Sequence, residues 1–131
     1  MELLRCKTRI AVLWVFMAVA MSAHFSFAAM VQGGLDKIIS EMEAAGAGMW
    51  VFMACFWLVP LWLAFLSITL MGSANRWVNF VLGIIFTLLN IYHFVEHLAE
   101  PSVQQILILG STVVVTALIT WYAWKWPKEE A

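Results

Sequence analysis

Four long apolar stretches constrain the fold of this chain more than any other feature of its sequence. They cover residues 10–31, 49–71, 77–98 and 103–124. Each has about the 20 residues that a helix needs to cross roughly 30 Å of hydrocarbon. A helix also satisfies its backbone hydrogen bonds within one segment, which an open strand in lipid cannot do. The sequence therefore predicts an all-α, polytopic membrane protein with four transmembrane helices in a single domain, residues 1–131.

The composition agrees with this prediction and excludes several classes of function. Hydrophobic residues make up 64% of the chain and charged residues only 11%, far from the balance of a soluble domain. The formal net charge of -1 provides no field that would attract nucleic acid. Cys6 and Cys55 match no zinc or Cys-x-x-Cys pattern. The expected partners are therefore the lipid bilayer and other membrane subunits, or further copies of the chain.

A short charged segment separates the first two apolar stretches. It reads GGLDKIISEMEAAGAG over residues 33–48, and its apolar side chains recur at helical spacing opposite the charged ones. The apolar set is Leu35, Ile38, Ile39 and Met42. This pattern is typical of an amphipathic helix that lies flat on a membrane surface. We therefore expect one short interfacial helix in addition to the four transmembrane helices.

Two prolines interrupt the apolar pattern in different ways. Pro60 lies in the middle of residues 49–71, where it removes one backbone hydrogen bond and is expected to kink the helix without ending it. Pro101 falls between the third and fourth stretches and suits the first turn of a new helix. The last two transmembrane helices are therefore expected to be joined by a tight connection.

The segment before the third stretch contains a predicted membrane anchor. Arg76 is expected to hold the water interface and Trp77 to lie at the level of the headgroups, while Asn75 caps the start of the helix. An anion or a lipid headgroup bound by Arg76 is the alternative interpretation.

Basic residues are distributed unequally between the two predicted sides of the membrane. Those on one side are Arg5, Lys7, Arg9, Arg76, Lys125 and Lys128, and Lys37 alone lies on the other. The positive-inside tendency then predicts a multi-pass protein of the inner (plasma) membrane with both termini in the cytoplasm. The stretch NIYHFVEHLAE, residues 90–100, falls at the outer end of its helix.

The first apolar stretch also has features of a secretory signal peptide. A basic start precedes the run IAVLWVFMAVAM, and the small residues SFAA follow it. Cleavage there would leave a protein with three transmembrane helices. Because the apolar run is longer than the core of most signal peptides, we expect this helix to be retained.

The third stretch has one polar stripe. At 100° per residue its polar side chains fall within an arc of about 80°. They are Asn75, Asn79, Asn90, His93, His97 and Glu100. Lipid cannot solvate such a stripe cheaply, so we expect Asn79, Asn90 and His93 to face the bundle or a subunit contact.

Three histidines share the predicted outer half of the bundle, and three interpretations of them stay open. In the first, they only form hydrogen bonds between helices. In the second, His93 and His97 bind a divalent metal such as Zn²⁺, with His24 or the Glu100 carboxylate as a third ligand. In the third, His24 and either His93 or His97 hold a haem or another macrocycle.

His-x-x-Glu-His, residues 93–97, also matches the inverted zinc-protease motif, in which Glu96 would be the general base. Glu96 lies about 100° from His97 around a helix, and no acidic ligand follows on a later helix. We therefore predict no catalytic residue.

Two segments resemble a known family. LSITLMGSANRWVNFVLGIIFTLL, residues 66–89, and TWYAWKWP, residues 120–127, are similar to an uncharacterised family of small four-helix bacterial membrane proteins, a domain of unknown function. The likeness covers about the last two-thirds of the chain. It implies the four-helix fold and assigns no activity to any residue.

The sequence favours a small non-enzymatic subunit or accessory of a membrane assembly, or a homo-oligomer. The first alternative is a membrane protein that holds haem, another macrocycle or a metal through its histidines. The second is a small transporter or channel subunit, although no acidic residue lies at mid-depth to relay an ion.

Overall fold

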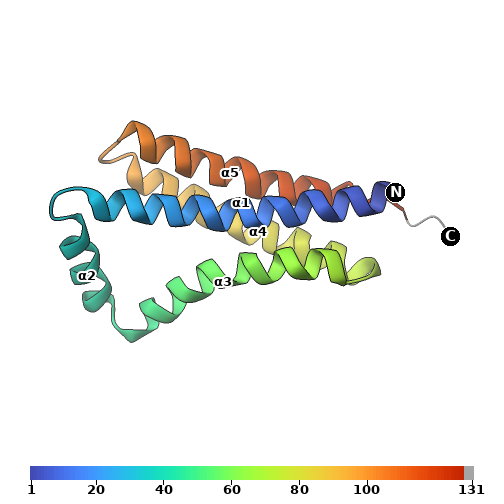
Figure 1. Ribbon diagram of the computed structural model, residues 1–131, viewed down its shortest axis with the longest axis horizontal. Coiled ribbons are helices and arrows are strands. Elements are labelled where there is room, and N and C mark those ends of the chain that lie inside the picture. Colours follow the sequence, from blue (N-terminus) through green and yellow to red (C-terminus); the bar gives the residue numbers. More distant parts are fainter. Residues whose placement is uncertain (129–131) are drawn as a thin grey trace.

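The computed structural model describes residues 1–128, and this part of the chain forms five helices (Figure 1). They are α1 (Glu2–Met30), α2 (Gly34–Ala45), α3 (Ala47–Thr69), α4 (Gly72–His97) and α5 (Val103–Trp124). All except α2 are long and apolar enough to cross a membrane. The predicted fold class, an all-α polytopic membrane protein with four transmembrane helices and one short additional helix, is therefore confirmed.

The long helices form a bundle with two distinct ends (Figure 1). The N-terminus, the α3–α4 connection and the last turn of α5 lie at one end, which we call the terminal end. The α2 helix and the α4–α5 connection lie at the other, the α2 end. Within the bundle α1 packs against α3 and α5, and α4 packs against α5.

Two helices begin at least one turn earlier than the apolar pattern predicts. α1 starts at Glu2, so its first turns carry the basic residues that were expected to precede it. Lys7 is one of them, and its Nζ donates a hydrogen bond to the carbonyl of Leu70, 2.7 Å away. α4 likewise starts at Gly72 and includes Arg76. Long basic side chains permit this extension because their charged heads can reach water from a helical backbone.

The core of the bundle consists of large side chains from all four long helices. Trp14 of α1 is fully buried and contacts Phe86 of α4 edge-to-face, with ring centroids 5.3 Å apart. Phe56 of α3 and Ile119 of α5 belong to the same cluster. Close approach of α4 and α5 depends on Gly83, because a Cβ atom there would lie 2.6 Å from the hydroxyl oxygen of Thr120.

A buried polar network joins three helices near the terminal end. Asn79 Oδ1 accepts hydrogen bonds from Trp14 Nε1 at 2.7 Å and from Ser67 Oγ at 2.9 Å, while Asn79 Nδ2 donates to Asn75 Oδ1 at 2.7 Å. We call these four residues the asparagine network. Its members come from α1, α3 and α4, so it fixes the register of these helices in an apolar environment.

The predicted capping role of Asn75 is wrong. α4 begins before Asn75, its N-cap is Met71, and that cap makes no side-chain hydrogen bond. Asn75 Nδ2 instead donates to the carbonyls of Ser67 and Leu70, at 2.8 and 2.9 Å. These carbonyls are at the end of α3, where helical backbone acceptors have no partner within their own helix. Asn75 therefore caps the end of the preceding helix.

α3 is continuous through Pro60. Figure 1 shows that α3 changes direction along its length and diverges from α1 toward the α2 end. Pro101 lies in the connection between α4 and α5, but it precedes α5, which begins at Val103, and is not in the first turn of that helix as predicted. α2 runs across the direction of the long helices and is bounded by Gly33 and Gly46, whose φ angles are 74° and 89° (Figure 1). Both angles favour glycine.

Candidate metal centre

The three histidines of the chain meet at the α2 end of the bundle. His24 comes from α1, whereas His93 and His97 lie one turn apart on α4. One ring nitrogen from each residue can be chosen such that all three lie within 4.8 Å of one another. We call this group the histidine site. No other histidine is present in the sequence, so every imidazole of the chain contributes to it.

The three rings are in mutual contact. The imidazoles of His93 and His97 are stacked, with centroids 4.5 Å apart and an interplanar angle of 21°. The ring of His24 approaches both edge-on, at centroid distances of 4.9 Å from His93 and 4.8 Å from His97. His24 is 7% exposed and the other two are half-buried. The site is thus closed on the α1 side and more open at the two histidines of α4.

Gln105, in the first turn of α5, fixes the tautomer of His24. Its Nε2 donates to the backbone carbonyl of His24 at 3.3 Å, and its Oε1 lies 2.5 Å from His24 Nδ1. A carbonyl can only accept, so the amide nitrogen must face the carbonyl and the amide oxygen must face Nδ1. Nδ1 of His24 is therefore the protonated nitrogen, and Nε2 carries the free lone pair.

The same reasoning applies to the other two rings. His97 Nδ1 lies 3.0 Å from the backbone carbonyl of His93 and must donate to it, which leaves the lone pair on Nε2 of His97. His93 Nε2 lies 2.9 Å from His24 Nε2. Because His24 has its lone pair there, His93 supplies the proton of this hydrogen bond. Two of the three imidazoles thus already have the tautomer that a metal ligand bound through Nε2 requires.

This donor set fits a divalent transition-metal ion. Imidazole suits Zn²⁺, Cu²⁺, Ni²⁺ and iron, and ligating histidines usually donate their other N–H to a carbonyl or carboxylate group. Zn–N bonds of about 2.0–2.1 Å in a tetrahedral site separate the ligand nitrogens by about 3.3 Å. To reach this value the His24–His93 separation of 2.9 Å must widen slightly, and the three nitrogens, which spread over as much as 4.8 Å, must move closer together. Binding also requires His93 to transfer its proton from Nε2 to Nδ1.

A macrocycle does not fit between His24 and His93. Two axial histidines bind iron from opposite faces of a haem, so the plane of the macrocycle must lie between them. The two rings are instead in direct contact through their Nε2 atoms. His97 contacts His24 as closely as His93 does. Neither pair therefore leaves space for the ring.

Glu100, the predicted carboxylate ligand, is not part of the histidine site. The prediction extended the helix through Glu100, but α4 ends at His97 and Glu100 lies in the turn that follows. Helical spacing therefore no longer places it beside His93. Glu96 is exposed on α4 and is also outside the site.

Asn79 and Asn90, the other members of the predicted stripe, are both 1% exposed. Asn79 has partners for both its amide nitrogen and its oxygen in the asparagine network. Asn90 differs, because its Nδ2 makes only two long contacts of 3.4 Å, to Thr112 and Thr116, and its Oδ1 has no hydrogen-bond partner among the described residues. The two asparagines therefore differ greatly in how fully their amide groups are hydrogen-bonded.

Arg76 and Trp77, the predicted anchor, lie at the terminal end, away from the histidine site. The guanidinium of Arg76 is 5.4 Å from the centre of the Trp77 ring, and one of its nitrogens donates to the carbonyl of Trp124 at 3.4 Å. The hydrogen bond ties the start of α4 to the end of α5.

Sequence reasoning missed Gln105, the residue that orients His24. The sequence feature that could have identified it is the position of this glutamine in the first turn of the fourth apolar stretch, at the same predicted end of the bundle as the histidines. The partnership of Trp14 and Ser67 with Asn79 was also missed, since both belong to other helices.

Comparison with known proteins adds no functional information, because no family model, curated protein or solved structure matches the chain. The resemblance of residues 66–89 and 120–127 to a bacterial membrane protein family stays a prediction.

Proposed function

We propose that this chain is an integral membrane protein that binds one divalent transition-metal ion at the histidine site. A single observation carries the proposal: imidazoles from two helices converge, and hydrogen bonds to carbonyl oxygens hold two of them with a lone pair on Nε2. Three protein ligands leave one coordination position for water or another small ligand. The proposal assigns no catalytic residue.

The proposed site faces the outside of the cell. The six basic residues named above lie at or near the terminal end of the bundle, whereas α2 carries Lys37 and several carboxylates at the other. The positive-inside tendency then favours cytoplasmic termini in the inner (plasma) membrane, with the histidine site near the outer surface.

The arrangement supports binding of an ion more than its passage across the membrane. The asparagine network has its donors directed at protein acceptors, and the contact between Trp14 and Phe86 closes the core beside it. A polar path through the bundle has no support from these contacts. An accessory role in a larger membrane assembly is compatible with metal binding and stays a prediction.

Metal analysis of the full-length protein tests this proposal. Protein purified in a mild non-ionic detergent and stripped with a chelator should take up one equivalent of Zn²⁺ after dialysis. His24→Gln, His93→Gln and His97→Gln should each weaken Zn²⁺ binding by at least tenfold, because three imidazoles act as one chelate. Ser26→Ala is the matched control and should bind normally, because Ser26 is exposed on α1 two residues after His24 and its hydroxyl donates only to the carbonyl of Ser22.

A wild-type protein that takes up no more Zn²⁺ than the His24→Gln/His93→Gln double variant would refute the proposal. In that case the histidines serve to join α1 to α4 through the 2.9 Å hydrogen bond alone.

A further inference from the structure

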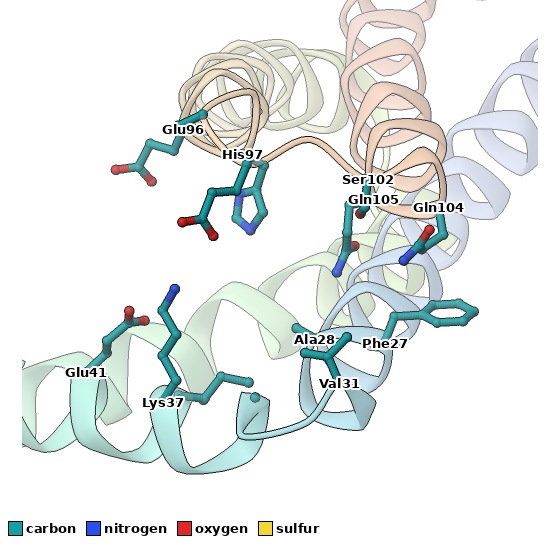
Figure 2. Close-up of a pocket in the computed structure, with 14 residues that line it drawn as sticks. Phe27, Ala28, Val31, Lys37, Glu41, Glu96, His97, Ser102, Gln104 and Gln105 are labelled. Atoms are coloured by element: carbon teal, nitrogen blue, oxygen red, sulfur yellow. The ribbon is translucent and has the colours of Figure 1, made fainter.

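A pocket of about 520 Å³ lies next to the histidine site at the α2 end. Its walls come from the end of α1, from α2, from the end of α4 and from the start of α5 (Figure 2). His97 and Gln105 both line it, whereas His24 and His93 do not. The pocket therefore reaches the histidine site at His97 and at Gln105, the residue that contacts His24.

The charges that line this pocket are mainly negative. Three carboxylates, those of Glu41, Glu96 and Glu100, stand against one ammonium group, that of Lys37. Figure 2 shows Glu96 and His97 on one side of the open space and Lys37 and Glu41 on the other. Apolar residues such as Phe27 and Val31 form another part of the wall. Walls of low polarizability concentrate the field of charges at a cleft and raise the local concentration of the opposite ion.

We infer that this pocket is the route by which a divalent cation from the aqueous phase reaches the histidine site, with Glu41, Glu96 and Glu100 attracting the ion electrostatically. This inference rests on the proposed function and adds a direction and a mechanism of access to it. The ion meets His97 first and is then enclosed by His93 and His24.

The carboxylates affect the rate at which the ion associates, because they lie outside the group of nitrogens that bind it. Their removal should slow association and leave dissociation nearly unchanged. Lys37 lies in the same pocket and has the opposite charge, so its removal should change the association rate in the opposite direction. A purely structural role of these exposed side chains predicts neither effect.

Stopped-flow binding of Co²⁺ to the full-length protein in non-ionic detergent provides the measurement, with the visible absorption of the bound ion as the signal. We expect the Glu41→Gln/Glu96→Gln/Glu100→Gln variant to bind Co²⁺ about tenfold more slowly at low salt, and its association rate to depend less on ionic strength. Lys37→Gln should associate faster than wild type. Dissociation rates, measured with excess chelator, should stay within about twofold in both variants.

Asp36→Asn/Glu43→Gln is the matched control, because it removes two carboxylates from α2 that do not line the pocket. An equal loss of association rate in this control, or an unchanged rate in the triple variant, would overturn the inference. If His24→Gln abolishes Co²⁺ binding but the triple variant associates with Co²⁺ at the wild-type rate, the proposed access route is wrong and the proposed metal site stands. Both proposals fail if wild type has no saturable Co²⁺ site.

Discussion

Gln105 contacts His24 twice: its amide nitrogen donates to the backbone carbonyl of His24, and its amide oxygen accepts from the imidazole Nδ1. The first contact determines the orientation of the amide, and the second transmits that orientation to the ring. A residue of α5 therefore fixes the tautomer of a histidine on α1, and the Nε2 lone pair of His24 is directed at Nε2 of His93 on α4.

The first prediction concerns this positioning role of Gln105. Gln105→Leu removes the acceptor for His24 Nδ1–H and should weaken Zn²⁺ binding by about 10- to 100-fold, the usual effect of losing such a partner. Gln105→Glu keeps an acceptor and should retain the affinity or increase it. Zn²⁺ competition titrations measure both. Equal affinities in the leucine and glutamate variants would show that Gln105 does not act through His24.

The second prediction separates two asparagines that the sequence treats alike. Asn79→Leu leaves the buried Trp14 Nε1 without its acceptor and should lower the free energy of unfolding by about 1–2 kcal/mol. Asn90→Leu removes an amide that has only long contacts and one unpaired oxygen, so it should cost less than about 0.5 kcal/mol. Thermal unfolding in detergent distinguishes the two. A larger loss for Asn90→Leu than for Asn79→Leu would contradict this assignment.

A third prediction tests the close approach of α4 to α5. Gly83→Ala would place its Cβ 2.6 Å from Thr120 Oγ1 and 3.2 Å from the Thr120 backbone nitrogen, so the Thr120 side chain must rotate and the two helices must move slightly apart. We expect a loss of about 1–3 kcal/mol in detergent unfolding assays. Gly110→Ala is the control, since its nearest contact is a side-chain atom of Phe94 at 3.9 Å. Similar melting temperatures for the two variants would mean that this contact relaxes freely.

The fourth prediction concerns orientation in the membrane. Single cysteines at Ala44 and Ser73, in a background of Cys6→Ala and Cys55→Ser, place one exposed thiol at each end of the bundle. A membrane-impermeant maleimide should label Ala44→Cys in intact cells and should label Ser73→Cys only after permeabilisation. The reverse labelling pattern would place the histidine site on the cytoplasmic side.

The sequence was sufficient to predict the four long helices, because each apolar stretch meets the length that a bilayer requires. It also predicted the short helix over residues 33–48, since apolar and charged side chains segregate there at helical spacing. Hydropathy could not locate the start of α1, because Arg5, Lys7 and Arg9 lie within the helix. Their polar heads lower the apolar signal without breaking the backbone pattern.

The candidate site was only partly predictable, because its parts come from three helices. Spacing on one helix identified His93 and His97, and the predicted topology placed His24 in the same outer half of the bundle. The same spacing included Glu100 incorrectly, because α4 ends before that residue. The partnership of Gln105 with His24 depends on how α5 packs beside α1, and that relationship is not encoded in the periodicity of either segment.

An ion held by His24, His93 and His97 would be a ligand that connects α1 with α4 across 69 positions of sequence. Thermodynamic linkage then ties the stability of the whole bundle to the concentration of free ion. At a free concentration 100 times the Kd, binding to the folded state alone contributes about 2.7 kcal/mol. Scarcity of the ion would loosen α1 from α4, so the amount of folded protein in the membrane would itself report how much metal the surroundings contain.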